Sequence, residues 1–140
     1  MTKKLLFTFV LLGLAFLTGC SNKQQRLTGT VTFSDDGTPV PTGSMLFLSE
    51  TVVARATIEN GQYTVSTMGH NDGIPIGHTF VVTITAEEIR TVQHPDGVTR
   101  EMPTSIIDPK YMDERTSGLS FTTDGTNRTF DIQVDRASRR

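Results

Sequence analysis

Apolar and polar residues alternate with a period of two through most of the chain from Leu27 onward. Successive side chains of a strand point to opposite sides, so this alternation predicts strands with one face in a core and the other in water. The first such strand has these inward positions: Leu27, Gly29, Val31 and Phe33. Residues 79–86 form the clearest one, with these inward positions: Phe80, Val82, Ile84 and Ala86.

Five further segments have strand patterns. Residues 44–48 form a continuous apolar run, which predicts a strand inside a sandwich. The other four segments alternate and are residues 53–58, the stretch around Tyr63 and Val65, residues 119–123 and residues 129–135.

Turn residues separate these segments. Asn60-Gly61 predicts a tight hairpin because both residues tolerate positive φ, and residues 124–127 are expected to join the last two segments as a pair. About seven short strands separated by turns predict a single all-β domain, an antiparallel β-sandwich. A small barrel is the alternative, and no segment after the first twenty residues shows a helical period.

One pair of β-leaning segments is polar on both faces. Residues 89–93 and 98–102 flank the turn His94-Pro95-Asp96-Gly97. This pattern predicts a hairpin arm that begins at Ile89, ends at Met102 and projects from the core. Its mixed charges suit a solvated edge that resists aggregation, or an edge that binds a strand of a partner protein.

The N-terminus has the pattern of a targeting signal. Lys3 and Lys4 precede an apolar run, residues 5–17, that is too short to cross a membrane. The run ends in Leu17-Thr18-Gly19-Cys20, which resembles the bacterial lipobox. The resemblance implies a signal peptide over residues 1–20 and lipidation of Cys20. A lipid-anchored protein of the bacterial envelope, facing the periplasm or the cell surface, is therefore expected.

The boundaries expected after Cys20 follow from composition. Residues 21–26 contain no apolar residue and are predicted to be a tether, residues 27–135 the sandwich, and residues 136–140 a flexible basic tail. Without Lys3 and Lys4 the chain has 11 basic and 15 acidic residues, a formal charge of −4. This charge argues against nucleic acid as a partner. The single Cys excludes an internal disulfide and a Cys-based metal site.

No catalytic motif is present in the sequence. The chain lacks Gly-x-Ser-x-Gly and His-Glu-x-x-His, so we expect no enzyme activity and no cofactor, with a small hydrolase as the weakest alternative. His70, Asp72 and His78 form the best metal candidate, because two imidazoles and a carboxylate suit zinc. They lie in a Gly-rich loop with no strand register to orient them, which favours solvated side chains.

Three motifs resemble one family in their order and spacing. Gly29-Thr30-Val31, the segment from Gly37 to Gly43 and the segment from Asn60 to Val65 resemble carboxypeptidase regulatory-like domains. Pro109-Lys110-Tyr111 and the residues after it resemble small lipoproteins of planctomycete-type bacteria. The resemblance implies a transthyretin-like, Greek-key sandwich in the envelope, without catalytic activity.

The expected function is a binding or structural role at the membrane surface. The membrane is contacted through lipidated Cys20, and a protein partner would bind the arm or an edge of the sheet. A module for carbohydrate or another small ligand is the alternative, although the chain has no Trp and only 2 Tyr to stack on a sugar. The large aromatic residues Tyr63, Phe80 and Tyr111 are expected in the core.

Overall fold

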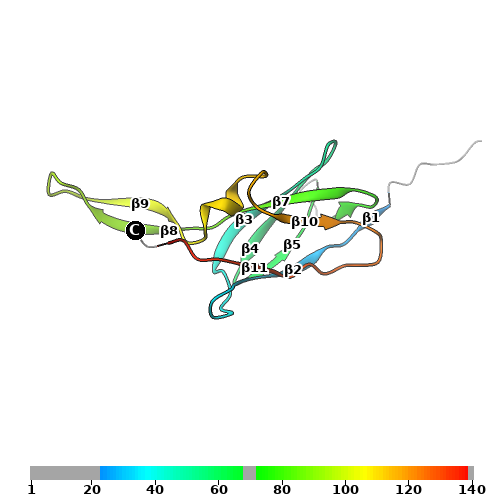
Figure 1. Cartoon of the computed structure of the whole chain (residues 1–140), viewed down its shortest axis with the longest axis horizontal. Helices are drawn as coiled ribbons and strands as arrows, with labels where there is room; N and C mark the ends of the chain where they lie inside the picture. Colours follow the sequence, from blue (N-terminus) through cyan, green and yellow to red (C-terminus); the bar gives the residue numbers. More distant parts are fainter. Residues whose placement is uncertain (1–22, 68–71, 139–140) are drawn as a thin grey trace, which may run out of the picture.

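The computed structural model describes residues 23–67 and 72–138 (Figure 1). The strands of the described residues are β1 (Gln24–Gln25), β2 (Thr28–Phe33), β3 (Thr42–Leu48), β4 (Val53–Glu59), β5 (Gln62–Thr64), β6 (Ile74–Pro75), β7 (Thr79–Thr85), β8 (Glu87–Gln93), β9 (Thr99–Ser105), β10 (Leu119–Thr122) and β11 (Ile132–Val134). A short 3-10 helix, η1, spans Pro109–Met112. The predicted signal peptide, Cys20 and His70 lie outside the described residues.

Seven strands form one sheet in the order β10-β7-β3-β4-β5-β2-β11. The pairs are antiparallel except for β11 and β2, which run parallel. The sheet curls so that its two ends approach each other: the ring centroids of Phe121 in β10 and Phe130 before β11 are 5.0 Å apart. The fold is therefore an all-β, mainly antiparallel sandwich, and this prediction is confirmed.

The predicted pairing of residues 119–123 with residues 129–135 is wrong. In β10, Leu119 lies opposite Val82 of β7, whereas in β11 Ile132 lies opposite Val31 of β2. The chain between β10 and β11 crosses from one end of the curled sheet to the other (Figure 1). Turn residues show where a chain reverses, but the neighbour that each strand then finds depends on packing far away in the sequence.

The inward faces of the strands form one core, as the alternation predicts. The buried apolar residues include Leu27, Val31, Phe33, Met45, Phe47, Ala54, Ala56, Ile58, Tyr63, Val65, Phe80, Val82, Ile84, Ala86, Tyr111, Ile132 and Val134. The strand predicted over residues 44–48 is present as part of β3, between β7 and β4. Met45 and Phe47 point into the core, while Leu46 on the other face is 36% exposed.

Gly29 and Tyr63 lie opposite each other where β2 and β5 pair. The hydroxyl of Tyr63 donates a hydrogen bond to the carbonyl oxygen of Phe130. A Cβ atom added to Gly29 would lie 2.1 Å from that oxygen and 2.8 Å from the Tyr63 hydroxyl oxygen. Glycine is therefore required here by the close approach of the chain segment that leads into β11.

The folded region begins earlier than Leu27, so the expected extent of the tether needs correction. β1 pairs with β6, and Gln25 is only 2% exposed. The Gln25 side chain donates to the carbonyl oxygen of Asn127 and accepts a 2.8 Å hydrogen bond from the Gly125 amide. A polar residue is buried here because both ends of its amide are satisfied by a loop about 100 residues away in sequence.

The expected flexible tail also begins in ordered structure. Arg136 forms ion pairs of 2.8 Å with Asp35 and Asp36, and its guanidinium lies 3.7 Å from the centroid of the Phe33 ring. The amide of Ala137 donates a 3.1 Å hydrogen bond to the carbonyl oxygen of Ile106. Charge pairing and stacking therefore hold the beginning of the predicted tail against the sandwich.

Candidate functional site

The arm is a two-stranded ribbon of β8 and β9, residues 87–105, and its projection from the sandwich confirms the predicted hairpin (Figure 1). It is longer than expected, because the pairing runs from Glu87 opposite Ser105 to Gln93 opposite Thr99. At the turn, the His94 amide donates to the Val98 carbonyl oxygen at 2.9 Å, and Gly97 has a φ of 82°.

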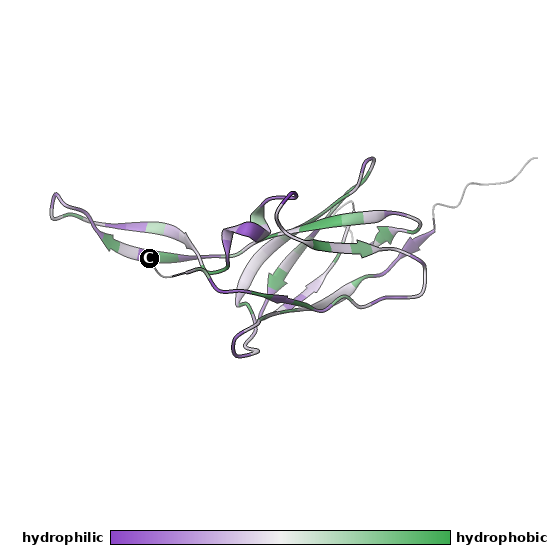
Figure 2. Ribbon diagram, in the orientation of Figure 1, coloured by the Kyte–Doolittle hydropathy of each residue, from purple (hydrophilic) through white to green (hydrophobic). Residues whose placement is uncertain are grey.

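The arm carries an unusual share of exposed apolar side chains. All seven residues of β8 are exposed. The exposed fractions of the arm's large apolar residues are Ile89 66%, Val92 40%, Val98 52% and Met102 44%. Figure 2 shows hydrophobic positions interspersed with hydrophilic ones along this ribbon. Apolar groups that gather on a projecting element are typical of a binding surface.

The two faces of the arm differ in chemistry. The pairing register places Glu87, Ile89 and Thr91 on one face, together with Glu101 and Pro103 of β9. The opposite face carries these residues: Glu88, Arg90, Val92, Arg100, Met102 and Thr104. Arg90 forms an ion pair with Glu88, and Arg100 lies 3.6 Å from Asp96. One face is therefore acidic, and the other presents two guanidinium groups paired with carboxylates.

The two outer edges of the arm also differ. The Ile106 amide donates to the Ala86 carbonyl oxygen, and His94 and Val98 are joined in the same way. Directly opposed residues alternate between bonded and non-bonded pairs, so the even-numbered residues bond within the arm. The N–H groups of the odd-numbered residues then point outward.

This parity makes the two outer edges unequal as acceptors of a further strand. On β9 an outward position is Pro103, which has no N–H to offer. On β8 the outward positions Ile89, Thr91 and Gln93 all keep their N–H groups. The outer edge of β8 is therefore equipped to accept another strand, while proline weakens the edge of β9 as an acceptor.

A hollow lies where the arm joins the sandwich. It has a volume of about 690 Å³, and its lining includes Glu88 and Arg90 of the arm, Phe33 and Pro41 of the sandwich, and Arg136. Thr104 and Ser105 of β9 also line it, so the hollow adjoins both strands at the base of the arm.

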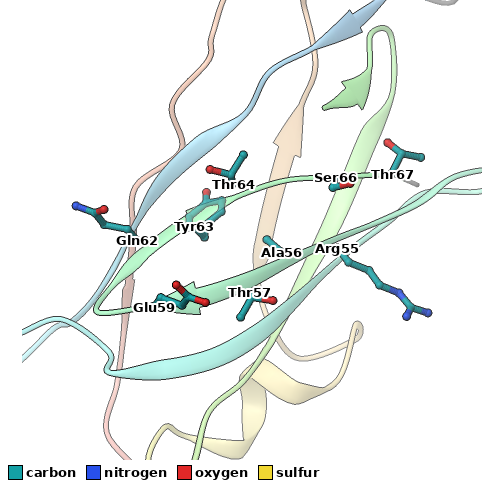
Figure 3. Close-up of a pocket in the computed structure, with 9 residues that line it drawn as sticks. All are labelled: Arg55, Ala56, Thr57, Glu59, Gln62, Tyr63, Thr64, Ser66 and Thr67. Carbon is teal, nitrogen blue, oxygen red and sulfur yellow. The ribbon is translucent and has the colours of Figure 1, made fainter. Parts of the chain in front are cut away.

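A second, polar hollow of about 650 Å³ lies between β4 and β5 (Figure 3). Glu59 pairs with Gln62 at one end of these strands, and Arg55 pairs with Ser66 at the other. The intermediate residues, Thr57 and Thr64, are not ladder partners. The strands therefore separate in the middle, and the residues lining the hollow are Arg55, Ala56, Thr57, Glu59, Gln62, Tyr63, Thr64, Ser66 and Thr67.

Tyr63 lines the inner side of this polar hollow and does not act as a reactive group. Burial raises the pKa of Tyr63, and the charge of Asp131 adds to the increase. The phenol stays neutral, and its O–H donates a hydrogen bond to the Phe130 carbonyl oxygen. The hollow thus offers hydroxyl, amide and ionic groups for binding.

The metal candidates are held by different contacts. Asp72 accepts hydrogen bonds from the Ser66 hydroxyl at 3.1 Å and from the Thr67 amide at 2.9 Å. The His78 ring packs against Phe80, with centroids 5.8 Å apart. Within residues 23–67 and 72–138 no three His, Cys, Asp or Glu side chains cluster as metal ligands. His70 is outside these ranges, so the zinc hypothesis stays a prediction.

Sequence reasoning did not identify the polar hollow or the difference between the two edges of the arm. No local signal marks the Thr57 and Thr64 positions where the ladder opens. Pro103 was a usable signal, because proline in a strand is confined to edges and bulges.

Comparison with known proteins leaves the family open. No family model matches the chain, and no curated protein matches it. One solved structure, a 9R-lipoxygenase from Cyanothece PCC8801, aligns over 77% of this chain and 15% of its own length, with 12% identity and a TM-score of 0.31. This likeness is too weak to inform either fold or function. In the described part of the chain, no helix is long and apolar enough to span a membrane.

Proposed function

We propose that this protein is a bacterial envelope lipoprotein, anchored through acyl chains on Cys20, whose β-sandwich presents the arm to a protein partner. The role is binding rather than catalysis. The observation that carries the proposal is the concentration of exposed apolar side chains on a ribbon outside the core, among them Ile89 at 66% and Val98 at 52% exposure.

The placement of the arm supports this role. β1 lies at one end of the sandwich and the arm extends from the other end (Figure 1). Cys20 precedes Gln24 by four positions, a distance of about 14 Å at most in extended chain. The anchor therefore attaches close to the β1 end, and the arm is directed away from the point of attachment.

The resemblance to carboxypeptidase regulatory-like domains belongs to the same proposal. A sandwich of this kind supplies a rigid, non-catalytic support for an interaction element. The anchoring part is tested separately: Cys20→Ala should abolish incorporation of labelled fatty acid and release the protein from membranes. A variant that still incorporates the label and fractionates with membranes would overturn the anchor.

The interaction part is tested by in-cell photo-cross-linking. A cross-linking amino acid replaces Ile89 on the arm, and a matched control replaces Val53, which is 47% exposed on the sandwich. We expect one dominant protein adduct from position 89 and not from position 53. Absence of an adduct, or the same adducts from both positions, would contradict the proposal.

A small polar ligand in the hollow between β4 and β5 is the second candidate function. Its support is the opened ladder, which exposes polar groups around Thr57 and Thr64. Soluble cell-wall glycan fragments should then raise the melting temperature of the purified protein. The shift should disappear in Gln62→Ala and persist in Arg128→Ala, a control at an exposed position. A shift in melting temperature that both variants retain would exclude the hollow as the binding site.

A further inference from the structure

The open edge of β8 suits a specific mode of binding, the addition of a further strand. We propose that an extended segment of another envelope protein adds to β8 as an antiparallel strand. This proposal rests on the proposed binding function of the arm and specifies its geometry. Antiparallel addition is chosen because such pairing is slightly more stable per residue than parallel pairing.

Main-chain groups provide the first part of the fit. The outward N–H groups of Ile89, Thr91 and Gln93 are available at alternate positions of β8, at the spacing that an added strand requires. The corresponding edge of β9 lacks a donor at Pro103. Addition at β8 is therefore favoured, and the missing donor on β9 disfavours growth of a continuous sheet.

Side chains define the chemistry of the added strand. A residue opposite Arg90 should be acidic, and a residue opposite Glu88 should be basic, because directly opposed charges on one face interact. Residues opposite Ile89 and Val92 should be apolar. Read from its N-terminus, the partner segment therefore has the pattern apolar, β-branched, acidic, apolar, basic.

A second copy of this chain matches the charges but not the available space. Its β8 would satisfy both charge pairs only when Ile89 lies opposite Ile89. That register places Ala86 of one copy opposite Val92 of the other. Ala86 is 1% exposed, so a second copy can pair only as far as Thr91 and leaves Val92 and Gln93 unpaired. A free segment of another protein can pair with the whole edge as far as Gln93, and we assign the added strand to such a segment.

Two proline variants test the edge directly. Thr91→Pro removes an outward N–H from β8, and Thr99→Pro makes the same change on the outer edge of β9. Neither substitution removes a hydrogen bond within the arm, because both positions are odd-numbered. The probe is a short synthetic peptide with Val-Thr-Glu-Val-Lys at its centre, added to the purified full chain. A peptide with the Glu and Lys exchanged is the control.

The expected results distinguish β8 from β9 as the binding edge and test the proposed charge pairs with the partner strand. Thr91→Pro should weaken binding of the probe at least about tenfold, since it removes a donor and blocks close approach, while Thr99→Pro should leave binding within about twofold. The exchanged peptide should bind about tenfold more weakly than the probe. Equal effects of the two proline variants, or equal binding of both peptides, would overturn strand addition at β8.

The same variants in cells distinguish this proposal from the broader one. The adduct from position 89 should disappear in Thr91→Pro and persist in Thr99→Pro. An adduct that survives both substitutions would refute strand addition and leave the arm as a binding element. An adduct consisting of two copies of this chain would refute the assignment to another protein.

Discussion

β7 and β8 are consecutive strands of equal length, yet they differ in the number of neighbouring strands and in burial. β7 has neighbours on both sides, β3 and β10, and buries Phe80, Val82 and Ile84. β8 begins two residues after β7 ends, has one neighbour, and exposes all seven of its residues. The same extended backbone therefore serves as core in one strand and as accessible surface in the next.

This contrast indicates how the arm can be ordered without a core of its own. An isolated two-stranded hairpin is marginally stable in water. Here the ribbon begins at an ordered base, where the Ile106 amide donates a 3.0 Å hydrogen bond to the Ala86 carbonyl oxygen. It ends in a turn that contains Gly97. Core burial should therefore control the stability of the sandwich, and changes in the arm should affect binding instead.

The largest expected effect tests this separation with one apolar truncation in each region. Phe80→Ala should lower the free energy of unfolding by about 3–5 kcal/mol, because Phe80 is fully buried and the change leaves a cavity. Ile89→Ala should change it by less than about 0.5 kcal/mol. Urea unfolding of both variants provides the measurement. A comparable loss in both would mean that the arm is part of the cooperative core.

The next effect concerns the close approach at Gly29. Gly29→Ala should destabilise the protein by about 3 kcal/mol, since its methyl group would overlap the Phe130 carbonyl oxygen. Tyr63→Phe should cost about 1 kcal/mol by removing the hydrogen bond to the same oxygen. If Gly29→Ala unfolds at the same urea concentration as the parent protein, β2 and the segment before β11 do not pack as described.

A smaller loss of stability is expected when the pH is lowered. It concerns the carboxylates that join separate chain segments of the sandwich. Hydrogen bonds from Lys110, Ser34 and Tyr111 lower the pKa of Asp135 to about 2, from a usual value of 3.8. The unfolded chain therefore binds more protons than the folded chain between these values. Stability from this group is present above about pH 4 and is lost as the pH falls towards 2.

The corresponding measurement compares pH profiles of urea unfolding. Asp135→Asn should flatten the decline between pH 4 and pH 2. Asp96→Asn on the arm is the matched control, because the Asp96 ion pair with Arg100 joins two exposed side chains of one hairpin. A profile that is flattened equally by both substitutions would contradict the contrast between the regions.

The parts of the fold that sequence could predict depend on local periodicity. Alternation identified the inward faces of β2, β4 and β7, and Asn60-Gly61 identified a hairpin whose two residues have positive φ. The arm was recognisable because residues 89–102 combine strand-forming residues with polar faces and good turn chemistry. These properties are encoded within about ten residues of chain.

The parts that sequence missed depend on contacts across about 100 residues. Nothing near Gln25 indicates that its amide is buried against Gly125, and nothing near Arg136 indicates its ion pairs with Asp35 and Asp36. The polar hollow is a local case, because it lies where Thr57 of β4 and Thr64 of β5 are not ladder partners although the residues on either side are paired. Periodicity encodes neither the long-range contacts nor this local loss of pairing.

Removal of the arm separates its role in binding from the stability of the sandwich. Replacing residues 89–103 by an Asn-Gly turn keeps the bonded pair Glu88 and Thr104 at the base. We expect a free energy of unfolding within about 1 kcal/mol of the parent protein. We also expect loss of co-purification with the partner identified by cross-linking at position 89. An unfolded variant would show that the arm is part of the core, and a folded variant that still retains this partner would show that the arm does not bind it.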